Sequence, residues 1–215
     1  MDRAVLANAV AITFVVIAAP MGGRYCWKTF THRATPRLAT WLIFLVASTL
    51  SLASYLAHAH ANVRASFAAN IGNRMDAVEL LAIVAAILFS SRHEPERRHL
   101  KRFDWYCLAS AFLIVMLWAA TGSNVMANLL LQMLMCVGYG PTLWHLLKEK
   151  RNTEPLDIWC ANLFLALLAL APPLLSRPCD WLAVIYAGRA TLCVVVLLAV
   201  MVYFHRQKVV STQPR

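Results

Sequence analysis

Residues 181–204 read WLAVIYAGRATLCVVVLLAVMVYF, an apolar run of 24 residues that contains one charged side chain, Arg189. A helix rises about 1.5 Å per residue, so a run of this length covers the ~30 Å hydrocarbon core of a bilayer. A soluble domain has no use for so long an unbroken apolar surface. The stretch therefore predicts a transmembrane helix with a charge near its middle.

Similar apolar runs recur along the whole chain of 215 residues, which is 60% hydrophobic and only 14% charged. The seven expected spans are Val5–Trp27, Leu38–His58, Met75–Ser91, Phe103–Thr121, Val125–Leu147, Ile158–Leu175 and Trp181–Phe204. Asp76 and Glu79 fall in the first turns of the third run, which makes it the weakest and leaves six spans as the alternative. The expected fold class is an all-α membrane protein, with the lipid bilayer as its solvent.

The basic residues distinguish the two sides of the expected bundle. Of the 20 Lys and Arg residues, 15 lie in one set of alternating loops and four in the other, with Arg189 inside the last span. Cytoplasmic loops concentrate Lys and Arg, so we expect the N-terminus outside and the C-terminus in the cytoplasm, as in a protein of the bacterial cytoplasmic (inner) membrane. Five tryptophans at span ends on the basic side are interpreted as interfacial anchors: Trp27, Trp41, Trp105, Trp144 and Trp159.

Two parts of the chain repeat one pattern: a proline late in one span, a basic loop, and a proline and a tryptophan at the start of the next span. The matching residues are Pro20, Pro36 and Trp41 in the first copy, and Pro141, Pro155 and Trp159 in the second. Parallel three-helix repeats need an odd helix between them. The expected domains are a bundle over 1–91, a cytoplasmic loop and linker helix over 92–122, a second bundle over 123–206, and a cytoplasmic tail over 207–215.

The segment Tyr139-Gly140-Pro141-Thr142, followed by the basic stretch Lys148–Thr153 and by Trp159, resembles the half-repeat of the PQ-loop and SWEET-type transporters. The resemblance covers Leu129–Arg206 well and the first half of the chain faintly. It implies seven helices in a three-one-three plan and transport by alternating access between two bundles. It supplies no substrate, because Thr142 stands where the name-giving motif of the family has glutamine.

Arg189 is the main candidate for binding a solute. An ionisable side chain at this depth costs roughly 2.5–3.5 kcal/mol on insertion scales, so it should face the bundle interior and have a partner. A guanidinium there can hold a carboxylate of a solute. The alternative is a structural ion pair with Glu79 in the third span. Glu79 can also serve as a protonatable group that couples transport to a proton gradient.

Several polar residues are further candidates for the binding site. Asn128 and Gln132 are spaced i, i+4 and present two amides on one face, either to a pocket or to a neighbouring helix. Weaker candidates on the same grounds are Asn162 and Tyr186. These polar groups and Arg189 together make up the predicted substrate site.

Two acids and two prolines are expected to act on the helices themselves. Asp76 and Asp180 open their helices from the outer side, as helix caps or as an outer gate. Pro20 and Pro141 each remove a backbone hydrogen bond and should bend their helices, as hinges or as static kinks.

The leading function is that of a facilitator or coupled carrier of a small polar solute, with a carboxylate as the group that Arg189 would hold. The alternative is a membrane receptor or interaction subunit with the same fold and no transport. An enzyme is not expected, because no nucleophile with a base and no metal-ligand cluster is visible. No metal and no cofactor are expected. The expected partners are the bilayer and the solute, with a homo-oligomer left open and nucleic acid excluded, because the basic residues form short clusters and no continuous stripe.

Overall fold

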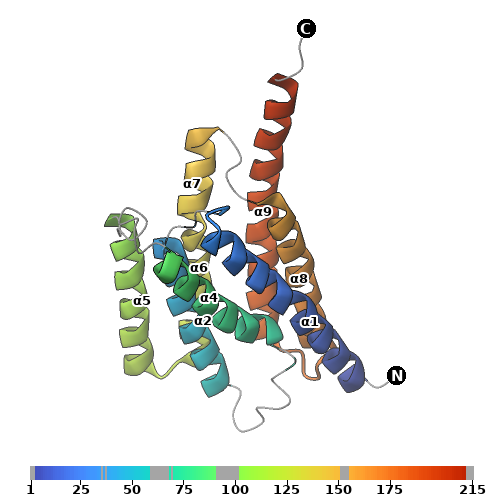
Figure 1. Ribbon diagram of the computed structural model, residues 1–215. Coiled ribbons are helices and arrows are strands. Elements are labelled where there is room, and N and C mark those ends of the chain that lie inside the picture. Colours follow the sequence, from blue (N-terminus) through green and yellow to red (C-terminus); the bar gives the residue numbers. More distant parts are fainter. Residues whose placement is uncertain are drawn as a thin grey trace.

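The structure is a computed structural model that describes residues 3–34, 36, 38–58, 68, 70–90, 102–150 and 155–211. All regular secondary structure in these ranges is helical (Figure 1). The helices are α1 (Arg3–Phe30), α2 (Leu38–His58), α4 (Ile71–Ser90), α5 (Arg102–Thr121), α6 (Asn124–Gly138), α7 (Gly140–Glu149), α8 (Leu156–Leu175) and α9 (Trp181–Ser211).

Five segments in the described ranges are long and apolar enough to cross a membrane: Arg3–Phe30, Thr40–His58, Asn124–Lys148, Leu156–Leu175 and Trp181–Phe204. Trp105–Thr121 in α5 is a shorter apolar helix. The chain is therefore a multi-pass all-α membrane protein, and five of the seven expected spans meet the length and composition of a membrane helix. The helix α4 differs because it carries three ionisable residues, Arg74, Asp76 and Glu79, within its 20 residues.

Two of the expected spans differ from the helices in ways that have a local reason. The helix α4 begins at Ile71, four residues before the expected start at Met75, because its polar first turns are buried in the protein, with Asn73 fully buried. The expected span Val125–Leu147 matches the candidate membrane segment Asn124–Lys148, within which the helix is interrupted at Tyr139, between α6 and α7. Pro141 has no N–H group to continue the hydrogen-bond ladder, and the N–H of Tyr139 bonds to the carbonyls of Cys136 and Val137 instead.

Among the described residues, five helices and the α6–α7 pair form a ring around the interior, in the order α1, α4, α2, α6–α7, α9 and α8. The helix α4 packs between α1 and α2, and α9 packs between α8 and the α6–α7 pair. The ring closes because α1 also packs on α8, and α2 also packs on α6. The helix α5 lies outside this ring, against α6 and α2 (Figure 1).

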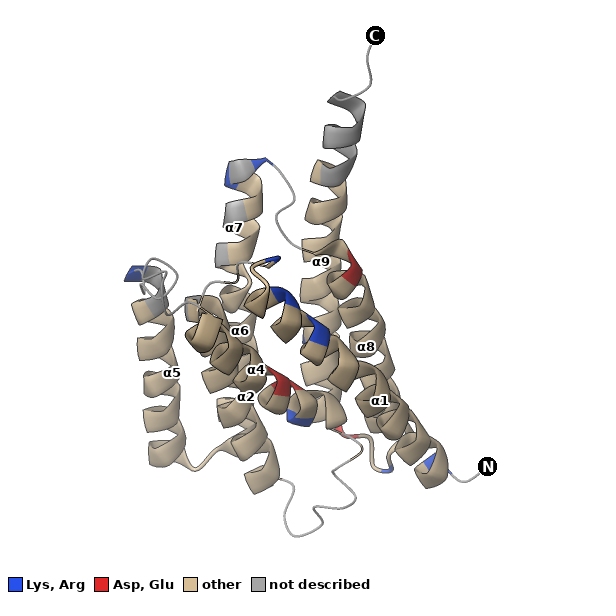
Figure 2. Ribbon diagram, in the orientation of Figure 1, with Lys and Arg blue, Asp and Glu red and all other residues tan. Residues whose placement is uncertain are grey.

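The outer surface is apolar, and charge collects at one end. Large apolar side chains such as Ile12, Val16 and Phe112 are 64–66% exposed, as expected for side chains in contact with lipid. In Figure 2, Lys and Arg gather where α1 and α7 end and where α5 begins. We call this the basic end of the molecule.

Candidate functional site

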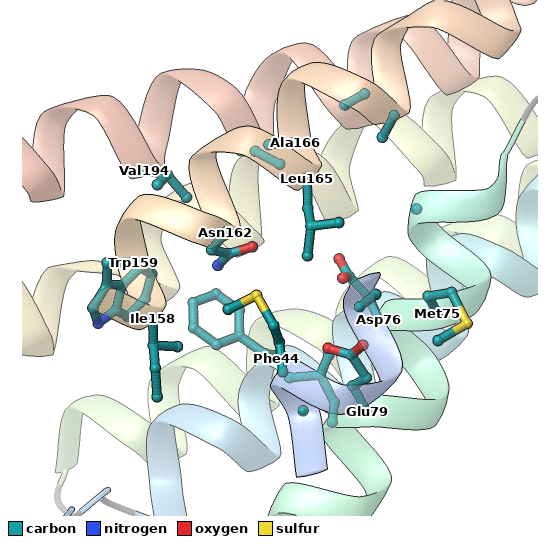
Figure 3. A pocket seen from close by; sticks show the side chains of 18 of the residues that line it. Phe44, Met75, Asp76, Glu79, Ile158, Trp159, Asn162, Leu165, Ala166 and Val194 are labelled. Atoms are coloured by element: carbon teal, nitrogen blue, oxygen red, sulfur yellow. The ribbon is translucent and has the colours of Figure 1, made fainter. Parts of the chain in front are cut away.

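A cavity of about 130 Å³ lies inside the ring, among α1, α2, α4, α8, α9 and the end of α6. Its polar wall is formed by Asp76, Glu79, Asn162, Tyr186 and Arg189. Figure 3 shows the carboxylates of Asp76 and Glu79 on one side and Asn162 and Leu165 of α8 across from them. The cavity also has an apolar lining, which includes Phe14, Met21, Phe44, Met135 and Leu165.

Arg189 lies at the cavity wall, nine residues into α9, as the sequence predicts for a charge in the middle of a span. Its Nε donates to Oε1 of Gln132 at 3.1 Å, and its guanidinium carbon lies 4.8 Å from the ring centre of Tyr186. Its Nη2 is buried and has no hydrogen-bond partner. A buried charged donor without a partner is costly, so this group is suited to an acceptor brought by a ligand.

Gln132 and Asn128 support Arg189 from outside the cavity and do not line it. Nε2 of Gln132 donates to Oγ of Ser51 at 2.9 Å and to Oδ1 of Asn128 at 3.3 Å. Nδ2 of Asn128 donates to the carbonyl of Ser51 at 3.0 Å and to Oγ of Ser54 at 3.2 Å. Of the two roles expected for these amides, the geometry gives the interhelical one, between α6 and α2.

The acidic side of the cavity is organised by Tyr186, whose hydroxyl donates to Oδ2 of Asp76 at 2.5 Å. Oγ of Ser48 lies 3.3 Å from the same hydroxyl and 3.0 Å from the amide of Asn73. Asp76 is therefore a cavity residue and not the helix cap predicted from the sequence, because α4 begins five residues earlier, at Ile71.

Glu79 lies one turn after Asp76 on the same face of α4. Its Oε1 is buried and has no hydrogen-bond partner. Its carboxyl group packs on α1 at Gly22, where an added Cβ atom would lie 3.1 Å from Cδ of Glu79. The small residue at position 22 thus leaves room for Glu79.

Glu79 and Arg189 form no ion pair, although the sequence suggested one as the structural alternative. In the described ranges the ion pairs join Asp157 at the start of α8 to Arg24 at 2.7 Å and to Lys28 at 3.1 Å, both on α1. Tyr186 connects the two sides, since its hydroxyl donates to Asp76 and its ring centre lies 4.8 Å from the guanidinium carbon of Arg189. Glu79 and Arg189 thus line one cavity without pairing with each other.

Asp180 is a helix cap, as expected. Its Oδ1 accepts from the backbone N–H of Ala183 at 3.2 Å in the first turn of α9. Its Oδ2 accepts a short hydrogen bond from the hydroxyl of Tyr55. This second contact links α2 to the start of α9, away from the cavity lining.

An aromatic cluster lines the part of the cavity toward the basic end. Its successive ring centroids are 5.0, 6.4, 4.9 and 6.3 Å apart, in the order Tyr25, Trp41, Phe44, Tyr139 and Trp159. The rings come from α1, α2, the α6–α7 break and α8. Trp159 is only 8% exposed, so its interpretation as an interfacial anchor is wrong, whereas Trp27, Trp105 and Trp144 are 61–70% exposed.

The two predicted prolines lie beside the cavity. Pro20 precedes the cavity residues Met21 and Gly22 within the continuous helix α1. Pro141 follows the break at Tyr139, another cavity residue. The helix is interrupted next to Pro141, and a kink or a hinge function for either proline stays a prediction.

No group of three or more His, Cys, Asp or Glu side chains that could hold a metal ion occurs among the described residues. Neither a protein-family model, a curated protein nor a solved structure matches the chain.

Proposed function

We propose that the chain is a membrane transporter that carries a small carboxylate-bearing solute by alternating access. The observation that carries the proposal is the state of Arg189, a half-buried arginine at the wall of a cavity. Gln132 fixes its Nε, and its Nη2 lacks a partner. A guanidinium with one edge fixed and another free is prepared to bind a carboxylate with little reorganisation.

The proposed architecture is seven spans in a three-one-three plan, with α5 as the linker helix. In this plan α1 corresponds to the α6–α7 pair, α2 to α8, and α4 to α9. The contact between α1 and α8 then has the contact between α6 and α2 as its symmetry equivalent, and both are present. Likewise, α4 packs between the other two helices of the first half, and α9 packs between the other two units of the second half. This pattern of contacts supports two parallel repeats with the cavity at their interface, as in transporters of this type.

The proposed orientation puts the basic end in the cytoplasm and the N-terminus outside. Lys and Arg gather at that end in Figure 2, and basic residues concentrate on the cytoplasmic side of membrane proteins. The cavity then lies between a cytoplasmic closure and an outer closure.

Both proposed closures join one repeat to the other. On the basic side, the aromatic cluster and the contacts of Asp157 with Arg24 and Lys28 connect α1 and α2 to the second half. On the outer side, the Tyr55–Asp180 hydrogen bond connects α2 to α9. Relative motion of the repeats can break one closure while keeping the other, which is the requirement for alternating access.

Uptake by purified protein in liposomes tests the proposal, with radiolabelled acetate, lactate, pyruvate, glycine and alanine as probes. We expect saturable uptake of at least one of them, loss of it in Arg189→Gln, and a decrease of about tenfold or more in Arg189→Lys, because lysine lacks the planar fork. The matched control is Arg3→Gln, which removes an exposed arginine at the start of α1, outside the cavity and both closures, and should retain uptake. Unchanged uptake in Arg189→Gln would refute the proposal.

A double variant separates this role from a structural one. If Arg189 served only to neutralise an acid, then Arg189→Gln would misfold and Arg189→Gln with Glu79→Gln would restore both folding and uptake. We expect the double variant to remain inactive.

A further inference from the structure

The cavity contains two unsatisfied groups of opposite kind. Nη2 of Arg189 on α9 is a buried cationic donor without an acceptor, and Oε1 of Glu79 on α4 is a buried acceptor without a donor. Both residues line the cavity, and they do not pair with each other. Two residues from different halves of the chain that line one cavity thus carry a buried donor and a buried acceptor without hydrogen-bond partners.

A solute with a carboxylate alone satisfies only one of these groups. It would bind the donor of Arg189 and leave Oε1 of Glu79 buried without a partner, at a cost comparable to a lost hydrogen bond. It would also bring a third negative group into a cavity that holds two carboxyl groups, Asp76 and Glu79, and one guanidinium. The cavity therefore selects against a simple anion.

An amine on the same solute removes both difficulties. An ammonium group brings three donors and one positive charge, so it can satisfy Glu79 while the carboxylate satisfies Arg189. A neutral polyol offers hydroxyl groups to both sites and compensates neither charge, which is unfavourable in a space of low dielectric constant.

The volume of the cavity restricts the size of the solute. The volume of about 130 Å³ is close to that of an engineered protein cavity of roughly 150 Å³ that binds benzene, a molecule of six heavy atoms. A solute of about five to seven heavy atoms fits this size. Met21, Met135 and Leu165 form apolar wall that suits a short hydrocarbon side chain.

We propose that the solute is a small zwitterionic amino acid, held with its carboxylate at Arg189 and its ammonium at Glu79. This inference rests on the proposed transport function and specifies the substrate class of the same cavity. Glycine, alanine, serine and β-alanine have the required size and charges. Asp76 keeps its hydrogen bond to Tyr186, which leaves Glu79 as the acceptor for the ammonium group.

Pairs of isosteric probes test the inference on the purified full-length protein, by binding calorimetry and thermal shift. L-Lactate replaces the ammonium of L-alanine with a hydroxyl, and L-alaninamide removes the negative charge of its carboxylate. Glycolate and glycinamide make the same comparison for glycine, and serine and β-alanine complete the panel. We expect the best-bound amino acid to bind about tenfold or more tightly than either of its single-charge analogues, because each analogue leaves one buried charged group unmatched.

Variants assign the two charges to their residues. Glu79→Gln should reduce the preference for alanine over lactate to about threefold or less, whereas Arg189→Gln should weaken the binding of both. Asp104→Asn makes an acid-to-amide change on α5, which lies outside the ring, and should leave the preference unchanged. The comparison in the native protein needs no variant, so a misfolded Glu79→Gln leaves the test intact.

The outcomes separate the two proposals. Equal binding of amino acids and their hydroxy-acid analogues would overturn the zwitterion and leave a carboxylate transporter standing. Binding of alaninamide as tight as that of alanine, or binding unaffected by Arg189→Gln, would overturn the carboxylate site and the proposed function with it. Failure of every probe to bind would count against both.

Discussion

Replacing Ser51 with alanine removes one oxygen atom that we expect to position Arg189. Oγ of Ser51 accepts from Nδ2 of Asn128 at 3.1 Å and from Nε2 of Gln132 at 2.9 Å. Interhelical hydrogen bonds in membrane proteins contribute about 0.6 kcal/mol on average and at most about 1.7. Oγ of Ser51 also lies 3.3 Å from the side-chain amide of Asn73 on α4, so the loss of these three bonds should lower the free energy of unfolding by about 1–2 kcal/mol.

The loss should extend to solute binding. Nε2 of Gln132 would keep only its 3.3 Å hydrogen bond to Asn128, so the acceptor that fixes Nε of Arg189 would be less well oriented. A cost of about 1–2 kcal/mol corresponds to a roughly 5–30-fold weaker affinity, an upper limit if the whole loss falls on the bound state. We expect KM for uptake to rise severalfold, with a smaller change in kcat.

Ser110→Ala is the matched control for this experiment. Ser110 is an exposed serine on α5 whose hydroxyl bonds within its own helix, to the carbonyl of Tyr106 at 2.8 Å. It should leave both stability in detergent and uptake in liposomes unchanged. If Ser51→Ala lost stability but kept its KM, the serine and amide network would be shown to hold helices together without orienting Arg189.

Three further predictions concern other parts of the chain. Gly22→Ala should weaken solute binding, because its Cβ atom would lie 3.1 Å from the Glu79 carboxyl group; Gly23→Ala, with nothing within 4 Å of the added atom, is its control, and equal affinities would contradict the account. Asp157→Asn removes the ion pairs with Arg24 and Lys28, so thiol reagents should reach a cysteine introduced at the cavity position Asn162 from the basic side faster than without this change; equal rates would mean that these pairs do not hold the closure. Reporters fused after Arg215 should be cytoplasmic and labels placed at Gly122 external, and an external C-terminus would rule out the proposed orientation.

The apolar runs predicted much of the fold, because lipid demands long apolar helices. The helix α2 has the predicted bounds Leu38–His58, and α9 begins at the predicted Trp181. Arg189 could be placed at a cavity from the sequence because a charge in the middle of a span is stable only inside the protein. The start of α4 could not be predicted in the same way, since its first turns contact protein and carry no apolar signal.

The remaining site residues depend on tertiary contacts that leave no local pattern. A serine such as Ser51 can satisfy its hydroxyl within its own helix, so its role in binding Gln132 becomes visible only when α6 is packed beside α2. Trp159 has the sequence position of an interfacial anchor, but in the structure it packs in a buried cluster with Leu146 and Leu197. The need for a glycine at position 22 cannot be predicted from the sequence, because it arises from the contact with Glu79 on another helix.

The serines of α2 also bear on how the protein is made. Asn128, which bonds to the carbonyl of Ser51, lies 77 residues later in the chain. At a synthesis rate of about 5–20 residues per second, α2 exists for roughly 4–15 s before that partner is translated. During this interval its hydroxyls can bond within the helix, as Ser54 does to the carbonyl of Ser51 at 2.9 Å. Serine thus allows α2 to enter the bilayer early with its hydroxyl groups hydrogen-bonded. An asparagine or glutamine at position 51 would leave its side-chain amide without hydrogen-bond partners in lipid until α6 is made.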